Sequence, residues 1–386
     1  MSLKVLITNI TMAGRTGTEI NVRDLALELF RRGHTPIVYS PHLGEIAHEI
    51  RTATVPVVEN LSKIGETPDI IHGHHHPVTM QALLHFPDTP AIFYCHDWDA
   101  WYDIPLVFPR VYRYIPVDWT VRDRLIYEQG ISEAKVMVAY NSVDLRRFQP
   151  RDPLPARPSL ALIFSRTATE DRVIGAVRSA CEAAGVELEV ISNAHGQATA
   201  EPEKLLPRFD VVFAKARCAL ESLAVGTAVI LCDEAGLGGL VTTGNVDNLR
   251  RLNFGRRTLR TPVTAEHVVR ELARYDPADA TAVSKHIRET AGLVMAVDHL
   301  LALYHEVIQE HRHTPQDLTA EGRTASAYLA QWGPSFSPDD LMHWNRKLDI
   351  RGPVPNSRII KENRHATVYK LFQHGRTIIR DILGLS

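Results

Sequence analysis

The stretch VVFAKARCALESLAVGTAVILCDEAGLGGLVTT, residues 211–243, decides the fold. Its apolar runs, Val211–Phe213 and Thr227–Leu231, frame a segment in which apolar residues recur at helical spacing up to Gly226. Unbroken apolar runs are typical of parallel strands that are covered on both faces. The stretch therefore predicts a strand, a helix and a second strand, followed by a glycine-rich loop at Gly236–Gly239.

Such a unit places the beginning of a helix beside the carboxyl ends of strands, where free N–H groups and the helix dipole favour an anionic ligand. Lys215 and Arg217 add positive charge at that point, and Glu221 follows one turn later, at a distance suited to the hydroxyls of a ribose. The sequence therefore predicts a nucleotide site here. A solvated helix start and a surface glutamate are the alternative interpretations.

Length and composition set the frame for the rest of the chain. At 386 residues it exceeds what one core usually supports, so two domains and a tail are expected. The 43 basic and 45 acidic residues nearly cancel, which argues against a nucleic-acid partner. Four scattered cysteines indicate free thiols in a reducing compartment. With no signal peptide and no apolar run of membrane-spanning length, the cytoplasm is the expected location.

The N-terminal part opens as strand, loop, helix and strand. Lys4–Thr8 is the first apolar run, and a loop with Gly14 and Gly17 leads into a helix that ends before the next strand, Pro36–Tyr39. This order is typical of a doubly wound sheet. Glycines without a Cβ atom let the backbone approach a phosphate or a sugar closely, and simple turn glycines are the alternative.

Histidines follow two of the predicted strands. His72 and His74 come at the end of one, in the run His72-Gly73-His74-His75-His76, and the strand Thr89–Cys95 delivers His96. Three consecutive histidines cannot converge on one ion from an extended backbone, so we expect hydrogen bonding to a substrate rather than a metal site. Structural roles remain the second alternative.

The apolar run Val136–Tyr140 predicts a further strand. A charged, proline-rich run, Arg151–Pro158, follows it and is the best linker candidate. The α/β alternation restarts after this run, and Ala282–His311 predicts a long helix. We expect an N-terminal domain at 1–155, a nucleotide-binding domain at 156–312 and a C-terminal extension at 313–386. Within the extension, Ala366–Leu385 predicts a basic amphipathic helix. Such a helix can pack on the N-terminal domain or on a second subunit, or lie on an anionic membrane.

Five motifs in this order resemble the family 4 type of GT-B glycosyltransferases, over approximately residues 4–308. The motifs are Thr16-Gly17-Thr18-Glu19 with Arg32-Gly33-His34, Asp69-Ile70-Ile71-His72-Gly73-His74, Tyr94-Cys95-His96-Asp97, Asn141-Ser142-Val143-Asp144 with Phe148, and Leu220-Glu221-Ser222-Leu223-Ala224. The resemblance implies an α/β GT-B architecture, with two Rossmann-like doubly wound domains facing a central cleft and a mainly helical C-terminal extension.

The resemblance also implies roles for single residues. His96 would be the catalytic residue beside the transferred sugar, and the groups that bind substrate would be Gly14, Gly17, His72, His74, Asn141, Arg166, Arg172, Lys215, Arg217, Glu221 and Gly238. The family has a second glutamate eight positions before the one that matches Glu221, and here Phe213 stands there. Arg172 stands where the family has a lysine, and an arginine also binds phosphate.

The function expected from this resemblance is transfer of a sugar, with retention of configuration, from a nucleotide-diphosphate sugar to a glycan, lipid-linked or small-molecule acceptor in surface glycan biosynthesis. No cofactor and no metal are expected, and peripheral membrane contact or a homo-oligomer would come from the terminal helix. The alternatives are a catalytically silent GT-B-like binding protein and a GT-B sugar-nucleotide epimerase. Loss of the upstream glutamate at Phe213 favours the silent protein.

Overall fold

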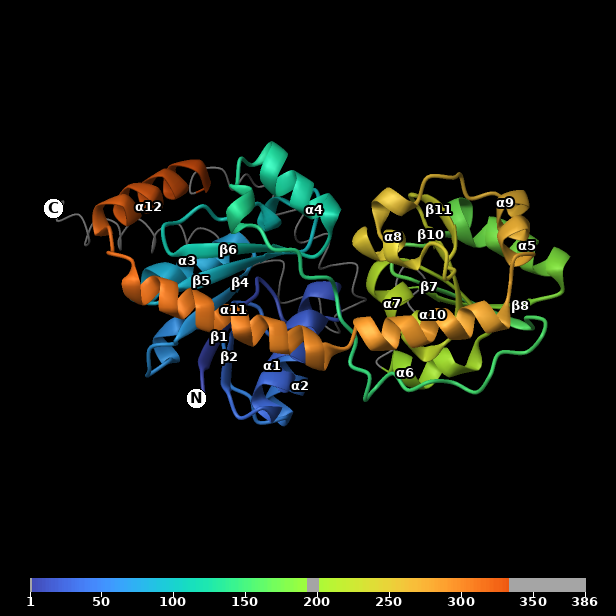
Figure 1. Ribbon diagram of the computed structural model, residues 1–386, viewed down its shortest axis with the longest axis horizontal. Coiled ribbons are helices and arrows are strands. Elements are labelled where there is room, and N and C mark those ends of the chain that lie inside the picture. Colours follow the sequence, from blue (N-terminus) through green and yellow to red (C-terminus); the bar gives the residue numbers. More distant parts are fainter. Residues whose placement is uncertain (1, 193–200, 333–386) are drawn as a thin grey trace, which may run out of the picture. The chain divides into compact units, whose positions relative to one another are not determined.

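The structure is a computed structural model that describes residues 2–192 and 201–332 (Figure 1). Two sheets organise these residues, each with its own buried apolar side chains. The predicted amphipathic helix at 366–385 lies outside the described residues. Within the described residues, no helix is both long and apolar enough to cross a membrane.

The first sheet has six parallel strands in the order β3-β2-β1-β4-β5-β6. Its strands are β1 Lys4–Thr8, β2 Thr35–Tyr39, β3 Val57–Val58, β4 Ile70–His74, β5 Ala91–Cys95 and β6 Val111–Pro116. The helices between them are α1 Gly17–Arg31, α2 Glu45–Thr52 and α3 His76–His85, and α4 Trp119–Asp123 follows β6. The strand order reverses between β1 and β4, which is where open α/β sheets bind ligands.

The second sheet has five strands in the order β11-β10-β9-β7-β8. Its strands are β7 Leu160–Ser165, β8 Glu187–Ser192, β9 Val211–Ala214, β10 Ala228–Asp233 and β11 Gly236–Leu240. Its helices are α5 Gly175–Ala184, α6 Pro202–Leu205, α7 Ala216–Val225, α8 Val246–Arg251, α9 Ala265–Leu272 and α10 Pro277–Thr290. Here the order reverses between β7 and β9, and β9 begins the stretch 211–243.

The long helix α11, Leu293–His313, packs on the first sheet although it follows the second in sequence (Figure 1). Its buried residues Val297, Leu303 and Tyr304 belong to the core of the first sheet. The last described helix is α12, Leu318–Trp332. Its Glu321 forms an ion pair of 2.8 Å with Arg110, the residue just before β6. The domain limits expected from the sequence stay a prediction.

The expected α/β architecture is confirmed, and three local expectations are wrong. The run Val136–Tyr140 forms only an isolated bridge, from Val136 to Tyr114, because the chain leaves the sheet there. The expected glycine-rich loop is the strand β11, which pairs antiparallel with β10. The helix expected from 282 to 311 is interrupted at Ala291 and Gly292, where the chain pairs with Val143.

Candidate functional site

Three histidine rings form a row at the carboxyl edge of the first sheet. His72 and His74 share one face of β4, with ring centroids 4.7 Å apart, because Gly73 between them faces α3. His96, just after β5, stacks on His74 at 4.8 Å, and the His74 Nδ1 and His96 Nε2 atoms are hydrogen bonded at 2.7 Å. The other end of the row is held by the Tyr304 hydroxyl, 2.5 Å from the His72 Nδ1 atom.

Burial keeps this row uncharged. It lowers the pKa of His72 to about 3 and that of His96 to about 3, and it places the pKa of His74 well below its usual value. Each ring is therefore neutral at pH 7 and carries one proton. Because His74 and His96 share one hydrogen bond, the proton position on His74 determines whether the remaining His96 nitrogen donates or accepts.

His75 begins α3 with φ of 62°, a conformation that a side chain other than glycine rarely adopts. Its Nδ1 atom accepts from the Ile10 N–H group at 3.2 Å, so the proton of the neutral ring lies on Nε2. Such strain is characteristic of sites where the surrounding structure forces a functional geometry.

Positive groups gather at the carboxyl edge of the second sheet. Lys215 precedes α7 and forms an ion pair with Asp233 at the end of β10, which also accepts from the Thr167 hydroxyl at 2.7 Å. Arg166 follows β7, is exposed, and has no hydrogen bond or ion pair within the described residues. Arg172 is also exposed and lies 3.7 Å from Glu234. Arg166 and Lys215 directly follow strands, as the sequence indicated, whereas Arg172 lies in the helical turn Glu170–Ile174 after β7. The roles of all three stay predictions.

Ala216 has φ of 49°, a conformation that favours glycine, so the beginning of α7 is strained. Its N–H group donates to the Phe254 carbonyl at 2.9 Å. The N–H groups that α7 leaves for an anion are therefore those that follow Ala216 in the first turn.

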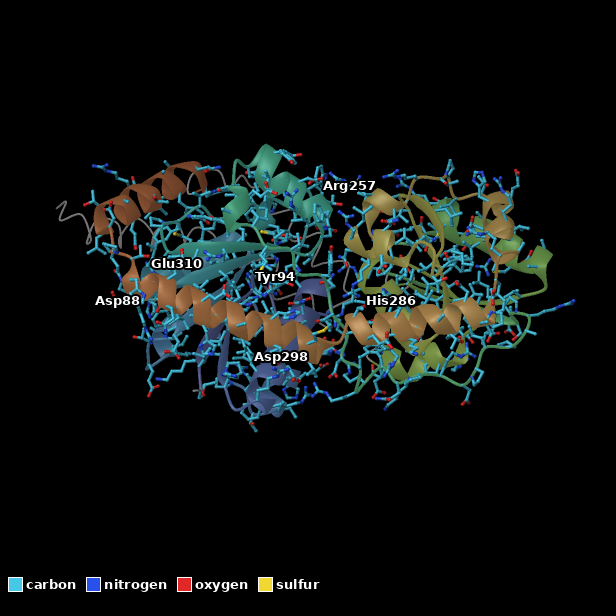
Figure 2. All side chains as sticks on the ribbon, in the orientation of Figure 1. Asp88, Tyr94, Arg257, His286, Asp298 and Glu310 are labelled. Carbon is cyan, nitrogen blue, oxygen red and sulfur yellow. The ribbon has the colours of Figure 1, made fainter. Side chains whose placement is uncertain are left out.

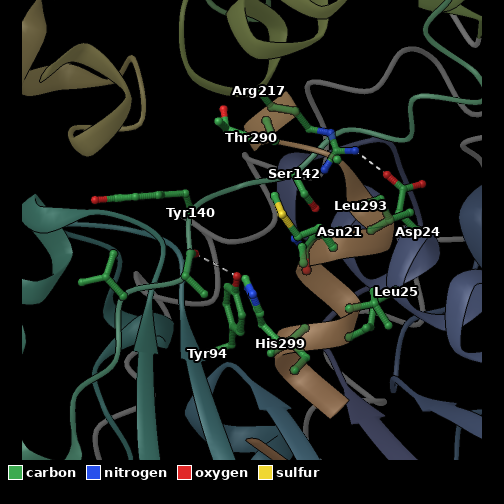
Figure 3. A pocket seen from close by; sticks show the side chains of 18 of the residues that line it. Asn21, Asp24, Leu25, Tyr94, Tyr140, Ser142, Arg217, Thr290, Leu293 and His299 are labelled. Atoms are coloured by element: carbon green, nitrogen blue, oxygen red, sulfur yellow. Dashed lines mark hydrogen bonds and ion pairs between the residues drawn. The ribbon is translucent and has the colours of Figure 1, made fainter. Parts of the chain in front are cut away.

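Arg217 and Glu221, one turn apart on α7, form an ion pair. The Arg217 Nε atom lies 2.8 Å from the Glu221 carboxylate, and its Nη2 atom contacts Asp24 of α1 (Figure 3). Burial raises the pKa of Glu221, opposed by the nearby Arg217 charge. Burial would also raise the pKa of Asp24, but Arg217 and Arg23 hold it below its usual value. The sequence expected Arg217 on phosphate and Glu221 on ribose, and each already has a protein partner.

Of the remaining expected residues, Gly14, Asn141 and Gly238 have structural roles, whereas Gly17 has open space around it. Gly14 donates its N–H to the buried Glu19 carboxylate at 2.8 Å, and Gly17 begins α1 with no atom near its absent Cβ. Asn141 donates to Asn253 at 3.0 Å. A Cβ on Gly238 would meet Leu231 and Thr258, so β11 packing already explains this glycine.

Sequence reasoning missed Asp24, Tyr304 and Asp103. The buried Asp103 accepts the N–H of His96 at 2.5 Å and that of Asp97, and burial raises its pKa to about 7. It therefore positions the chain that carries His96. Asp24 could have been found from the sequence, because it is a charged residue within the apolar helical pattern of α1. No sequence pattern singles out Tyr304 or Asp103. Within the described residues, no group of three histidine, cysteine or acidic side chains could hold a metal.

Residues 15–147 match the family model described as Glycosyltransferase Family 4. The match lies in the part of the chain that forms the first sheet. There the chain resembles family 4 glycosyltransferases, and its two α/β sheets have the GT-B fold. A comparison with curated protein sequences finds no match.

Solved glycosyltransferase structures share the fold at low identity. A glycosyltransferase from Rickettsia africae ESF-5 is 13% identical and has a TM-score of 0.56, over 80% of this chain and 99% of that chain. Anabaena HepE, in complex with UDP and glucose, is 13% identical with a TM-score of 0.55, over 78% and 99%. Starch synthase IV from Arabidopsis thaliana, bound to ADP and acarbose, is 11% identical with a TM-score of 0.50, over 80% and 100%. The GT-B fold expected from the motifs is thus confirmed.

Proposed function

We propose that this protein transfers a sugar, with retention of configuration, from a nucleotide-diphosphate sugar to a glycan, lipid-linked or small-molecule acceptor in surface glycan biosynthesis. The observation that supports the proposal is that the candidate side chains follow strands at or next to the point where each strand order reverses. In the first sheet, His74 ends β4 at the reversal and is hydrogen bonded to His96, which follows the neighbouring strand β5. In the second sheet, Arg166 follows β7 and Lys215 follows β9, the two strands at the reversal. The Asp24–Arg217 ion pair joins helices of the two sheets beside them.

The cations would act on the leaving group. Departure of a sugar from a nucleoside diphosphate leaves negative charge on the phosphate oxygens, which the enzyme must stabilise. Arg166 is exposed and without a carboxylate partner in the described residues, so it can bind phosphate without first breaking an ion pair. Arg172 and Lys215 would assist. A charge-assisted hydrogen bond of this kind contributes roughly 1.5–3 kcal/mol.

His96 would act on the sugar. Its lowered pKa, a consequence of burial, makes it a neutral hydrogen-bonding group that does not repel the positive charge developing near the anomeric carbon. Glu221 would accept from the ribose hydroxyls, with Arg217 shared between it and Asp24. Gly14 and Gly17 would allow close approach of the backbone to the donor, and His72, Asn141 and Gly238 would support the site.

The nucleotide class is inferred from two structural neighbours. HepE is described with UDP and glucose, and starch synthase IV with ADP and acarbose. We therefore infer a nucleoside diphosphate as the leaving group here. We also propose a cytoplasmic location, with which its four free cysteines agree. For residues 366–385 we propose peripheral membrane contact or self-association.

The test is the shift in melting temperature caused by UDP, GDP and ADP. We expect one of them to stabilise the protein and Arg166→Ala to weaken its binding by about tenfold or more, since a phosphate contact is lost. Arg178→Ala is the matched control, because Arg178 is an exposed arginine of α5 paired with Glu170. Absence of a shift with all three nucleotides would contradict the proposal.

A catalytically silent binding protein is the second candidate. Phe213 is buried in β9 where the family has an acid, and Glu221 already has a cationic partner. Saturable nucleotide binding, without nucleotide release from any UDP-, GDP- or ADP-sugar offered with acceptors, would favour it.

A further inference from the structure

A cavity of about 280 Å³ lies where the chain crosses between the two sheets (Figure 3). One wall is the outgoing crossing, Met137–Tyr140 with Ser142, and another is the returning crossing, Thr290–Leu293. Helices α1 and α11 supply further walls. The cavity therefore touches both segments of chain that connect the two sheets.

The two crossings are joined to each other beside this cavity. Val143 donates its N–H to the Ala291 carbonyl at 2.9 Å, and its own carbonyl accepts from Leu293 N–H at 2.9 Å. These two hydrogen bonds hold the outgoing and returning segments together beside the cavity.

Most of the lining is apolar. Leu25, Leu293 and Leu300 contribute branched side chains, and Met137 and Met295 add flexible ones. Figure 3 shows Leu25 and Leu293 on the helices and Tyr94, whose hydroxyl donates to the Ala139 carbonyl, on the sheet side. A surface of this type favours a hydrocarbon or aromatic group.

Two arginines line the cavity, and they differ in how their charge is balanced. Arg217 is paired with Asp24 and Glu221. Arg250 has no carboxylate at ion-pair distance within residues 2–192 and 201–332. Its Nη2 atom donates to the Thr290 carbonyl at 3.1 Å, and its guanidinium lies 5.6 Å from the centre of the Tyr140 ring.

The Arg250 Nη1 atom is buried and has no hydrogen-bond partner in the described part of the protein. A buried donor without an acceptor destabilises the protein, more so when it belongs to a charged group. Burial also lowers the pKa of Arg250, the direction expected for a cation whose charge is not balanced. An anionic acceptor would remove both costs.

We propose that this cavity binds a small amphipathic anion, with a carboxylate, sulfonate or phosphate head at Arg250 and an apolar tail among Leu25, Leu293 and Met295. Its volume is at the lower end of small-molecule sites, roughly 300–1,000 Å³, so the ligand has about a dozen non-hydrogen atoms. Because the ligand contacts both crossings, its binding stabilises the connection between the sheets. Arg217 lines the cavity and also belongs to the proposed nucleotide site, but the head group is assigned to Arg250 and the tail to apolar residues that the nucleotide site does not use.

The experiment measures octanoate binding to the full chain at pH 7.5 by isothermal calorimetry. Octanol is the neutral comparison and acetate the one without a tail. We expect saturable octanoate binding that is at least about tenfold tighter than octanol binding, because the charged hydrogen bond to Arg250 is lost with the alcohol. Equal binding of octanoate and octanol, or no saturable binding, would overturn the proposal without any variant.

Two variants locate the site. Ala296→Phe places a ring in the cavity and is expected to abolish binding, whereas Val294→Phe, on an exposed position of the same helix outside the lining, leaves it unchanged. Arg250→Gln is expected to weaken octanoate by about tenfold and octanol little. Unchanged binding to folded Ala296→Phe would show a different site and overturn the proposal.

Discussion

Asp103 shows how one buried residue links sequence to site. Its Oδ2 atom accepts two successive N–H groups, from His96 and Asp97, and so orients the turn that carries His96. Burial raises its folded pKa to about 7, against roughly 3.9 in an unfolded chain. The folded protein therefore binds this proton more tightly than the unfolded chain between these pH values.

Because the folded pKa is raised, the stabilisation from Asp103 is present at low pH and is lost as pH rises toward 7. We expect Asp103→Asn, which cannot ionise, to remove this trend. Between pH 5 and pH 8 the wild type should lose about 2–3 kcal/mol of unfolding free energy more than the variant. Urea unfolding at both pH values measures the difference, with the exposed Asp99→Asn as the control. Parallel losses in all three proteins would refute it.

His96 gives the second prediction at this scale. We expect His96→Ala to lower turnover by roughly 10²–10³-fold, the usual cost of removing one positioned hydrogen-bonding group, and to leave nucleotide binding intact. Release of nucleotide from the active sugar donor measures turnover, and the melting shift measures binding. Lys135→Ala, an exposed substitution, is the control. Full turnover in His96→Ala would remove this residue from the mechanism.

At the scale of elements, hydrophobic periodicity predicted most of the order of strands and helices, but not where each of them begins and ends. The run 211–231 is strand, helix and strand as expected, since burial on both faces and a glycine at the helix end are local signals. The strand β11 was missed because glycines have low strand propensity, and only its pairing with β10 extends them. The break between α10 and α11 was missed because it depends on backbone pairing between Gly292 and Val143, which lies far away in sequence.

Helix α12 gives the prediction for this scale. Its Glu321 contacts Arg110 at 2.8 Å in a buried pair, and its Tyr328 hydroxyl lies 2.7 Å from the His76 Nδ1 atom. We expect Glu321→Gln to accelerate hydrogen exchange of residues 318–332 by at least about tenfold, since it leaves a buried charge without its counter-charge.

Glu310→Gln is the matched control, because its pair with Arg113 is partly exposed and contributes little (Figure 2). Hydrogen exchange followed by mass spectrometry of peptides from 318–332 compares the two variants. Equal exchange in both would mean that α12 is held by its aromatic contacts alone.

At the scale of the whole molecule, the ion pair between Asp24 and Arg217 joins α1 of the first sheet to α7 of the second. Both side chains are buried, so their attraction is little screened by water. A double-mutant cycle with Asp24→Asn and Arg217→Gln should give a coupling energy of about 1–3 kcal/mol in urea unfolding.

The comparison is Asp99→Asn with Arg256→Gln, a pair of 3.3 Å that also links the two halves but is exposed. We expect its coupling to be no more than about 0.5 kcal/mol. Equal coupling of the two pairs would show that the buried contact does not hold the sheets together. Arg257, which contacts Asp123 at 2.6 Å, lies in the same region of contact (Figure 2).

The sequence by itself determined the two α/β halves, the family motifs and the placement of His96, Arg166 and Lys215 at strand ends, because apolar periodicity and strand ends are local properties. Only the tertiary structure decided which charges meet. Arg217 and Asp24 are 193 positions apart, and no local pattern encodes their contact. Burial then shifted the pKa values of His72, His96 and Asp103, since desolvation depends on all the elements that pack around a group.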